Sequence, residues 1–286
     1  MSALHGRKVP RVLSIAGSDP SGGAGIQADL KSIAAHCGYG MAVITALTAQ
    51  NTQGVRGVHA PPAEFVTQQL DAVSDDIAVD AVKIGMLGTA GVADAVGAWL
   101  RRVRPPVVVI DPVMISTSGD RLLEPAAEAA LRDLISLADL VTPNIPELAA
   151  LTGAAEAVTW TEVVAQARQV AHEHDVLVLA KGGHLMASDT PDALVSAAGE
   201  EARVSGPRLV ATSTHGTGCS LSSAMATLRV TTGSWPESLR RATTWLRAAI
   251  ARGESLGVGS RGGHGPVDHL GMLWDAAGVK PYALEA

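Results

Sequence analysis

Short apolar segments alternate with amphipathic segments along most of the chain. The apolar segments predict β-strands at residues 12–16, 42–47, 82–87, 107–110, 139–141 and 176–180. Between them, apolar residues recur at helical spacing and predict helices near residues 26–37, 62–73, 92–100, 126–137 and 161–174. Such regular alternation is typical of the α/β class, in which a mostly parallel sheet carries helices on both faces.

The pattern changes in the last third of the chain. Between residues 192 and 210, short strand-like segments next to glycines predict an antiparallel hairpin added to the sheet. A glycine-containing turn at 213–219 then leads into a helix of small residues. Ser234 and Glu237 have the spacing of a capping box, which predicts a final amphipathic helix after Ser234.

The composition fits one α/β domain. The chain has 286 residues, of which 47% are hydrophobic and 17% charged, so it can bury a large core. No linker-like, repetitive or low-complexity stretch interrupts it, and we expect a single domain over residues 1–286 with a disordered tail at 1–10. The formal net charge of −6 argues against a nucleic-acid-binding protein, which would need a basic face.

Cysteine content and hydropathy indicate the cell compartment. Cys37 and Cys219 are the only cysteines, and no Cys/His cluster has metal-ligand spacing, which disfavours a disulfide scaffold or a zinc site. The N-terminus lacks the apolar core of a signal peptide, and the strongest apolar run, residues 107–115, is broken by Asp111 and Pro112. We therefore expect a soluble cytoplasmic protein that does not contact a membrane.

Polar side chains follow the predicted strands where each strand ends. Ligands of open α/β sheets bind outside the carboxyl ends of the strands. The residues at these ends are Ser18 and Asp19, Gln50 and Asn51, Asp111, Asn144 and Glu147, Lys181, and the turn at 214–219. Their positions predict one binding site along that edge of the sheet.

Several common nucleotide and hydrolase motifs do not explain this site. Residues 23–28 fit a loose G-x-G-x-x-A dinucleotide motif, but the second strand ends in Gln50 and Asn51, where that motif needs an acidic residue for the ribose. The sequence also lacks a G-x-x-x-x-G-K-[ST] phosphate loop and the G-x-S-x-G and H-E-x-x-H motifs. A dinucleotide-dependent dehydrogenase is therefore disfavoured.

The turn at 213–219 has the features of an anion-binding site. Gly216 and Gly218 let a phosphate approach the backbone, and the helix that follows directs its unpaired N–H groups at the same point. Cys219 stands at this junction, where the field of the helix is expected to lower the pKa of its thiol. The plain alternative is a helix start with two glycines and a half-buried cysteine.

The other strand-end residues supply what phosphoryl transfer needs. Lys181 can neutralise phosphate charge, and the Gly216–Gly218 amides can hold the transferred group. Asp111, Asn144 and Glu147 offer oxygen ligands of the kind that Mg²⁺ prefers. Alternatively, Asp111 could be a turn former before Pro112, and Glu147 a charge partner for its own helix N-terminus.

Seven stretches identify a resemblance to a known family. They are residues 14–31, 43–52, 83–87, 111–114, 142–147, 181–184 and 214–219. With them the chain resembles, over nearly its whole length, the bacterial hydroxymethylpyrimidine/phosphomethylpyrimidine kinases of thiamine biosynthesis. The combination of Asp29, Gln50 and Cys219 is the most specific part of the match.

The resemblance implies a ribokinase-like three-layer α-β-α sandwich and a homodimer that uses ATP and Mg²⁺. It implies phosphorylation of 4-amino-5-hydroxymethyl-2-methylpyrimidine and then of its monophosphate. The residues it assigns to the pyrimidine are Asp29, Gln50 and Met86, with Val113 packing on the ring, and those for the nucleotide are Lys181, Thr214, Gly216, Thr217 and Gly218. Thr48 stands where many relatives have valine, and Cys219 takes the place of the aspartate base of related sugar kinases, either as a proton acceptor or only to shape the anion hole.

Three other functions compete with this one. Some bacterial pyridoxal kinases resemble the same family and keep the cysteine, and pyridoxine also carries a hydroxymethyl group on a six-membered nitrogen ring. A pyrimidine-binding sensor would bind without turnover, which the set of Lys181, Glu147 and Cys219 disfavours. A sugar kinase is disfavoured by the missing aspartate, and we expect no appended thiamine-phosphate synthase domain in the remaining residues.

Overall fold

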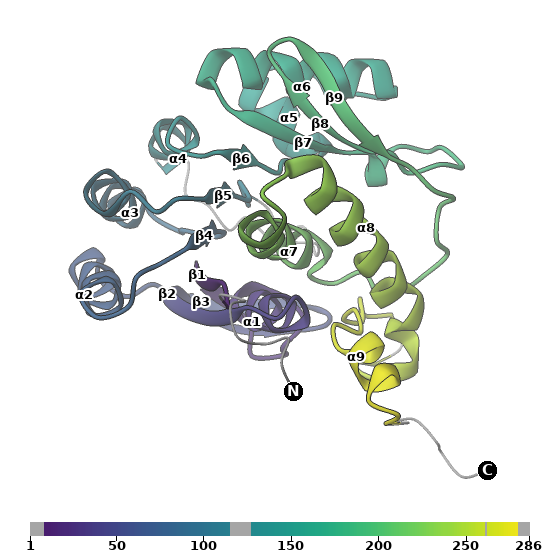
Figure 1. The fold of residues 1–286 in the computed structure, drawn as a ribbon, viewed down its shortest axis with the longest axis horizontal. Helices are drawn as coiled ribbons and strands as arrows, with labels where there is room; N and C mark the ends of the chain where they lie inside the picture. Colours follow the sequence, from purple (N-terminus) through teal and green to yellow (C-terminus); the bar gives the residue numbers. More distant parts are fainter. Residues whose placement is uncertain (1–8, 115–126, 261, 280–286) are drawn as a thin grey trace, which may run out of the picture.

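The computed structural model describes residues 9–114, 127–260 and 262–279, and these build one continuous sheet between two layers of helices (Figure 1). Nine strands form the sheet in the order β3-β2-β1-β4-β5-β6-β7-β8-β9 within the described residues. The strands are β1 (Arg11–Ser18), β2 (Tyr39–Asn51), β3 (Gly54–His59), β4 (Ala81–Ile84), β5 (Val108–Ile110), β6 (Leu140–Val141), β7 (Leu177–Lys181), β8 (Asp192–Ser196) and β9 (Gly199–Val204).

The strands β2-β1-β4-β5-β6-β7, in sheet order, run parallel, and antiparallel strands flank them at both edges. β3 pairs antiparallel with β2, and the hairpin β8–β9 continues the sheet from β7. The mostly parallel sheet and the hairpin after residue 192 confirm the predicted fold class.

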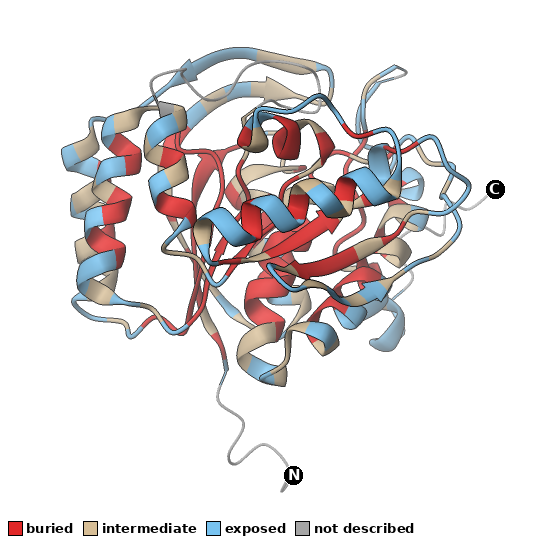
Figure 2. Cartoon of the chain, turned by 90° about the horizontal axis from the view of Figure 1, so that it is seen from above, coloured by how far each residue is buried: buried red, intermediate tan, exposed pale blue. Residues whose placement is uncertain are grey.

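Helices cover both faces of the sheet. They are α1 (Gly25–Ala35), α2 (Ala63–Ser74), α3 (Ala90–Val103), α4 (Ala127–Ile135), α5 (Ile145–Thr152), α6 (Trp160–His174), α7 (Thr217–Thr232), α8 (Trp235–Arg252) and α9 (Gly271–Ala276), with 3₁₀ turns η1 (Gly182–His184) and η2 (Gly253–Leu256). One face packs against α2 to α6 and the other against α1, α7 and α8 (Figures 1 and 2).

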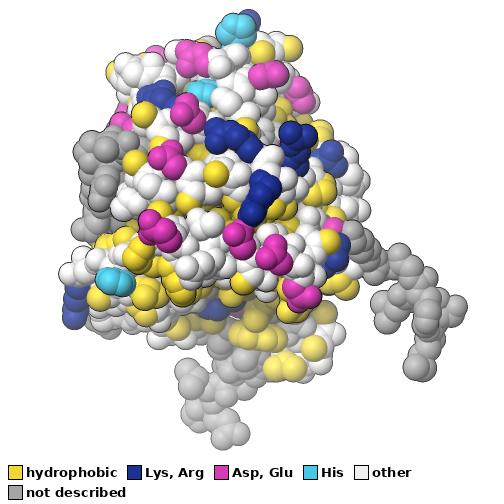
Figure 3. Space-filling model, turned by 90° about the vertical axis from the view of Figure 1, so that its left-hand side faces the viewer, with side chains coloured by type: hydrophobic (Ala, Val, Ile, Leu, Met, Phe, Trp, Pro, Cys, Tyr) yellow, Lys and Arg dark blue, Asp and Glu magenta, His cyan; other side chains and the backbone are white. Residues whose placement is uncertain are grey.

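Side-chain alternation along the strands divides the core in two. In β1, Leu13 and Ile15 point into the layer of α2 to α6, whereas Val12 points toward α1, α7 and α8. Both cores are built of buried aliphatic residues, as the composition predicts for a sheet covered on each side. The outer surface of α2, α3 and α4 carries mixed acidic and basic side chains, including the ion pair between Arg102 and Asp71 (Figure 3).

Helix α7 begins at the centre of the carboxyl edge of the sheet. Its N-cap, Gly216, has a φ of +76°, and the helix packs between α1 and α8 and against β1, β4 and β5. Its buried positions include Ser223, Ala224 and Ala226, and such short side chains let a helix lie close to the sheet. The predicted small-residue helix thus brings its N-terminus to the strand ends.

The sequence prediction did not include strand β3 or helix α9, and it gave no range for helix α5. Strand β3 forms a hairpin with β2, and helix α9 follows the glycine-rich segment near the C-terminus. Strand β2 is also longer than the apolar run at 42–47 because it extends through Gln50 and Asn51 into the hairpin. Ala126 and residues 1–8 of the predicted tail lie outside the described residues.

None of the helices within 9–114, 127–260 and 262–279 combines the length and apolar character of a membrane span.

Candidate active site

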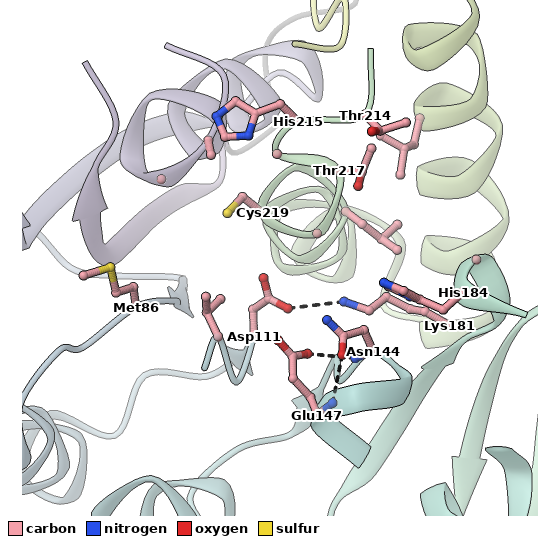
Figure 4. A pocket seen from close by; sticks show the side chains of 18 of the residues that line it. Met86, Asp111, Asn144, Glu147, Lys181, His184, Thr214, His215, Thr217 and Cys219 are labelled. Atoms are coloured by element: carbon pink, nitrogen blue, oxygen red, sulfur yellow. Dashed lines mark hydrogen bonds and ion pairs between the residues drawn. The ribbon is translucent and has the colours of Figure 1, made fainter. Parts of the chain in front are cut away.

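A cavity of about 740 Å³ lies at the carboxyl ends of the parallel strands (Figure 4). Thirteen of the fourteen predicted site residues line it: Thr48, Gln50, Met86, Asp111, Val113, Asn144, Glu147, Lys181, Thr214, Gly216, Thr217, Gly218 and Cys219. The structure therefore brings together the strand-end residues that the sequence placed at one edge. Asp29, and Asn51 among the strand-end residues, do not line the cavity wall.

The anion-binding turn is shaped by close backbone contacts. A Cβ on Gly216 would lie 1.8 Å from the carbonyl oxygen of Gly23, and its φ of +76° also favours glycine. A Cβ on Gly218 would lie 3.5 Å from Asp111 Oδ2 and 3.7 Å from Lys181 Nζ. The first turn of α7 therefore faces the charged cluster with no side chain of its own in the way at position 218.

Lys181 and Asp111 form the centre of that cluster. Lys181 Nζ lies 3.4 Å from Asp111 Oδ1, which also accepts a hydrogen bond of 2.8 Å from Thr142 Oγ1 (Figure 4). Burial alone would lower the pKa of Lys181, but the charges of Asp111 and Glu147 outweigh it and raise the pKa. The ammonium therefore stays charged in the cavity, as phosphate binding requires.

Asn144 and Glu147 form a capping box at the start of α5. Asn144 Oδ1 accepts from the Glu147 amide at 2.9 Å, and Glu147 Oε2 accepts from the Asn144 amide at 2.8 Å. The plain alternative for Glu147 thus holds, yet its carboxyl also faces Asp111 and Lys181 across the cavity (Figure 4). Burial raises the pKa of Glu147 to about 7.

The donor set fits Mg²⁺ rather than a transition metal. Asp111 and Glu147 supply two carboxylates beside a phosphate-binding turn, and Mg²⁺ in phosphate sites is held by one or two carboxylates together with waters and phosphates. In the part of the chain that the structure describes, no group of three His, Cys, Asp or Glu residues could hold a metal ion. Asn144 Oδ1 is already committed to the helix cap, so the two carboxylates are the better candidates.

The predicted low pKa of Cys219 is wrong. Cys219 lies half-buried in the first turn of α7, and burial raises the pKa of its thiol to about 11 despite the opposing charge of Lys83. The carboxylates of Asp29 and Asp111 raise it further. The helix N-terminus was the only influence visible in the sequence, whereas desolvation and the acidic neighbours come from the fold. The thiol is therefore protonated at neutral pH.

Thr48 and Gln50 belong to β2, which lies at the opposite end of the parallel strands from β7, the strand of Lys181. Thr48 Oγ1 donates to the Ser18 carbonyl oxygen at 2.8 Å and lies 3.3 Å from Gln50 Oε1. The hydroxyl of Thr48 is therefore bound to the last residue of β1. Met86, after β4, and Val113, after β5, add apolar surface to the cavity.

Asp29 lies behind the lining residue Lys83, to which it is bonded, and is fully buried. Its oxygens accept from Ser14 Oγ at 2.6 Å, Ser223 Oγ at 2.8 Å and Lys83 Nζ at 2.9 Å. Lys83, which the sequence analysis did not single out, lines the cavity with no exposed surface. Lys83 could have been identified from the sequence because it is the one charged residue inside the apolar strand 82–87.

The cavity is also lined by Asp19, which the sequence analysis placed at a strand end, and by His215 of the turn at 214–219. Asp19 and His215 form a buried pair at 2.8 Å between the loop after β1 and the turn before α7. Helix α8 contributes Leu246 and Ile250 to the cavity wall. The sequence analysis included His215 in this turn and gave it no role of its own.

The sequence matches the family described as phosphomethylpyrimidine kinase over residues 19–268. It is 52% identical to a thiamine biosynthesis multifunctional protein ThiED of Corynebacterium glutamicum, over 98% of this chain and 37% of that protein. It is 46% identical to the hydroxymethylpyrimidine/phosphomethylpyrimidine kinase of Escherichia coli, over 92% of this chain and 98% of that protein. The chain thus spans little more than a third of the Corynebacterium relative and nearly all of the Escherichia coli one.

Solved structures give the same fold. A Bacillus subtilis pyridoxal kinase in complex with ADP has a TM-score of 0.81 and 30% identity, covering 93% of this chain and 99% of that one. A phosphomethylpyrimidine kinase of Clostridium difficile has a TM-score of 0.73 and 38% identity, covering 85% and 100%. The pyrimidine kinase is closer in sequence, and the pyridoxal kinase overlaps more of the fold.

Proposed function

The chain belongs to the phosphomethylpyrimidine kinase family, and we propose that it transfers the γ-phosphoryl group of ATP to 4-amino-5-hydroxymethyl-2-methylpyrimidine and then to its monophosphate. The observation that carries the proposal is the shared cavity, which is lined by the anion-binding turn, by Lys181 of β7 and by Gln50 of β2, and β2 and β7 lie at opposite ends of the row of parallel strands. That arrangement suits a phosphate donor and a small polar ring held together.

The acceptor ring is proposed to bind between Gln50 and Met86. A side-chain amide can donate to a ring nitrogen and accept from an exocyclic amine, which matches an aminopyrimidine. Thr48 holds the loop after β1 beside Gln50 through the Ser18 carbonyl, and Val113 offers apolar surface for the ring. Because Asp29 is enclosed by Lys83 and two serines, we propose that it supports the acceptor site by holding Lys83 in place and does not contact the ring.

Phosphoryl transfer is proposed to occur against the first turn of α7. The amides around Gly216 and Gly218 can accept the transferred group, and Lys181 neutralises phosphate charge as the bond to the leaving oxygen breaks. Asp111 and Glu147 would hold Mg²⁺, which neutralises the phosphates and orients them. Thr214 and Thr217 place hydroxyls beside the same turn.

We propose that Cys219 assists removal of the hydroxyl proton, with capture by a phosphate oxygen as the alternative. Because its pKa is about 11, only a small fraction of the thiol is ionised at neutral pH. A base of this kind makes turnover depend on pH, which separates the two alternatives.

Pyridoxal is the second candidate acceptor, since the pyridoxal kinase of Bacillus subtilis shares the fold at a TM-score of 0.81. The test is ADP release with each acceptor at matched concentrations. We expect kcat/KM to be higher for the pyrimidine by at least about tenfold, a difference of about 1.4 kcal/mol in transition-state stabilisation. A higher value for pyridoxal would reassign the protein.

The assembly and location belong to the same proposal. We propose one kinase domain that acts in the cytoplasm as a homodimer. The exposed apolar side chains Tyr39, Leu47 and Val58 on β2 and β3 support a contact between copies at that edge of the sheet. Sedimentation of the purified protein tests the dimer.

A further inference from the structure

Two loops from opposite ends of the chain meet beside the anion-binding turn. One, residues 19–24, lies between β1 and α1, and the other, residues 213–216, precedes α7. The buried side chains of Asp19 and His215 join them.

Asp19 organises the first loop. Its Oδ1 accepts from the amide and hydroxyl of Ser21 at 2.9 and 2.7 Å, and its Oδ2 accepts from the amides of Gly23 and Ala24 at 3.2 and 2.8 Å. Burial would raise the pKa of Asp19, but the hydrogen bonds, that from His215 foremost, hold it well below its usual range. The carboxylate is ionised and accepts every one of these bonds, so His215 Nε2 must carry the proton that it shares with Asp19 Oδ2 at 2.8 Å.

His215 is held from both sides. Its ring reaches the first loop, and its backbone amide donates to the Gly265 carbonyl oxygen at 3.0 Å. The next residue, Gly216, is the N-cap of α7. A change in the backbone angles of His215 would therefore turn Gly216 and the first amides of that helix.

The two loops also touch directly, because neither Gly23 nor Gly216 carries a side chain that would hold them apart. A Cβ on Gly23 would lie 2.4 Å from His215 Cδ2, and one on Gly216 would lie 1.8 Å from the Gly23 carbonyl oxygen. The loop that Asp19 orders is thus the surface against which Gly216 is seated. The position of the anion-binding amides depends on it.

The same loop reaches the proposed acceptor end. Thr48, beside Gln50, donates to the carbonyl oxygen of Ser18, and Ser18 precedes Asp19 directly. A continuous set of contacts therefore runs from the residues proposed to hold the ring to the turn proposed to hold the phosphate.

We propose that Asp19 and His215 are a pair of positioning residues that fixes the anion-binding amides of α7 relative to the acceptor. The inference rests on the proposed function, because it assigns the pair to the phosphoryl-transfer step. The pair touches neither reacting atom and acts through Gly216. Misplacing catalytic groups by about an ångström costs rate while leaving much of the binding intact.

The test is the steady-state kinetics of His215→Leu and His215→Gln at a temperature at which circular dichroism shows both to be folded. We expect His215→Leu to lower kcat about 100-fold and to change KM for either substrate by less than about threefold. His215→Gln can still donate to Asp19, so it should recover at least about tenfold of that loss. His172→Leu, on the exposed face of α6, is the matched control and should leave kcat unchanged.

A double-mutant cycle tests whether the two residues act together. In the Asp19→Asn background, His215→Leu should change kcat by no more than about twofold. A kcat of His215→Leu within about twofold of the unsubstituted protein, or fully multiplicative losses in the cycle, would overturn the inference. Each kcat is compared with that of the unsubstituted protein, using the acceptor that the unsubstituted protein phosphorylates. If the pyrimidine is not the acceptor, the unsubstituted protein alone shows this, and the test of the pair is unaffected.

Discussion

Lys83 Nζ lies 2.9 Å from both carboxylate oxygens of Asp29, and neither side chain has any exposed surface. The pair joins β4 to α1, and Ser223 of α7 donates to the same carboxylate. A buried ion pair of this kind is costly to break, because removing one partner leaves the other charge without compensation.

Asp29→Ala should therefore destabilise the protein by about 3–5 kcal/mol. Urea denaturation followed by circular dichroism measures the change. Asp71→Ala is the matched control because it removes one partner of an exposed pair with Arg102 and should cost less than about 1 kcal/mol. A fully stable Asp29→Ala protein whose only defect is a raised KM for the pyrimidine would instead support the direct contact implied by the family resemblance.

The second prediction concerns Cys219. Its pKa is raised in the folded protein to about 11, so the thiolate fraction grows about tenfold with each pH unit between 7 and 10. If the thiolate is the proton acceptor, kcat should rise in parallel from pH 7 to pH 9, and Cys219→Ser and Cys219→Ala should lose most of the turnover and the rise. Rate against pH in all three proteins is the measurement.

A pH-independent kcat, or full turnover in both variants, would exclude Cys219 as the base. Alkylation by iodoacetamide gives an independent reading of the thiol in a Cys37→Ser background, since Cys37 is exposed and would react first. The rate at Cys219 should be slow at pH 7 and climb toward pH 11.

The third prediction concerns Gln50. Gln50→Leu removes both a donor and an acceptor from the cavity wall and should raise KM for the pyrimidine about 10- to 100-fold, leaving the nucleotide KM within about twofold. Gln50→Glu is the shape-matched control, because it keeps the acceptor and loses the donor. Equal losses of pyrimidine and nucleotide binding in Gln50→Leu would show a structural role only.

The fourth prediction follows from the burial of Glu147. Its pKa is raised to about 7, so the fold favours the protonated form, and stability is lost as pH rises from about 4.5 through 7. In the presence of a chelator, Glu147→Gln should be more stable than the unsubstituted protein at pH 8 by about 1–3 kcal/mol, and no more stable at pH 4.5. Gln can still accept from the Asn144 amide, so the helix cap is preserved.

The same variant tests the proposed magnesium site. Removing one of two carboxylates should raise the Mg²⁺ concentration needed for half-maximal turnover at least about tenfold. Glu162→Gln is the control, since Glu162 belongs to an equivalent capping box on α6 at an exposed position. Unchanged magnesium dependence in Glu147→Gln would leave Glu147 as a capping residue alone.

The parallel part of the fold could be predicted because its strands are buried on both faces. Continuous apolar runs such as 107–110 identify such strands without knowledge of their neighbours. Strand β3 was missed because most of its residues are exposed and its sequence, with Gly54, Arg56 and Gly57, shows no apolar alternation. It exists as a strand because it pairs with β2.

The positions of the site residues could be predicted from the sequence, but their interaction partners could not. The position of residues at strand ends follows from topology, so Asp111, Lys181 and the turn before α7 converge as expected. What the sequence does not contain is the partner of each charge. Asp29 meets Lys83 across 54 positions, and the pKa of Cys219 is set by burial and by carboxylates distant in the chain.

We propose above that the protein phosphorylates an aminopyrimidine twice in the same cavity. The most direct test of this claim is the mass of the products formed over time by the purified protein with Mg-ATP and hydroxymethylpyrimidine, with pyridoxal in a parallel reaction. We predict a pyrimidine monophosphate that accumulates first and is then converted to the diphosphate. Phosphorylated pyridoxal together with an unchanged pyrimidine would contradict the claim and reassign the protein to vitamin B6 phosphorylation.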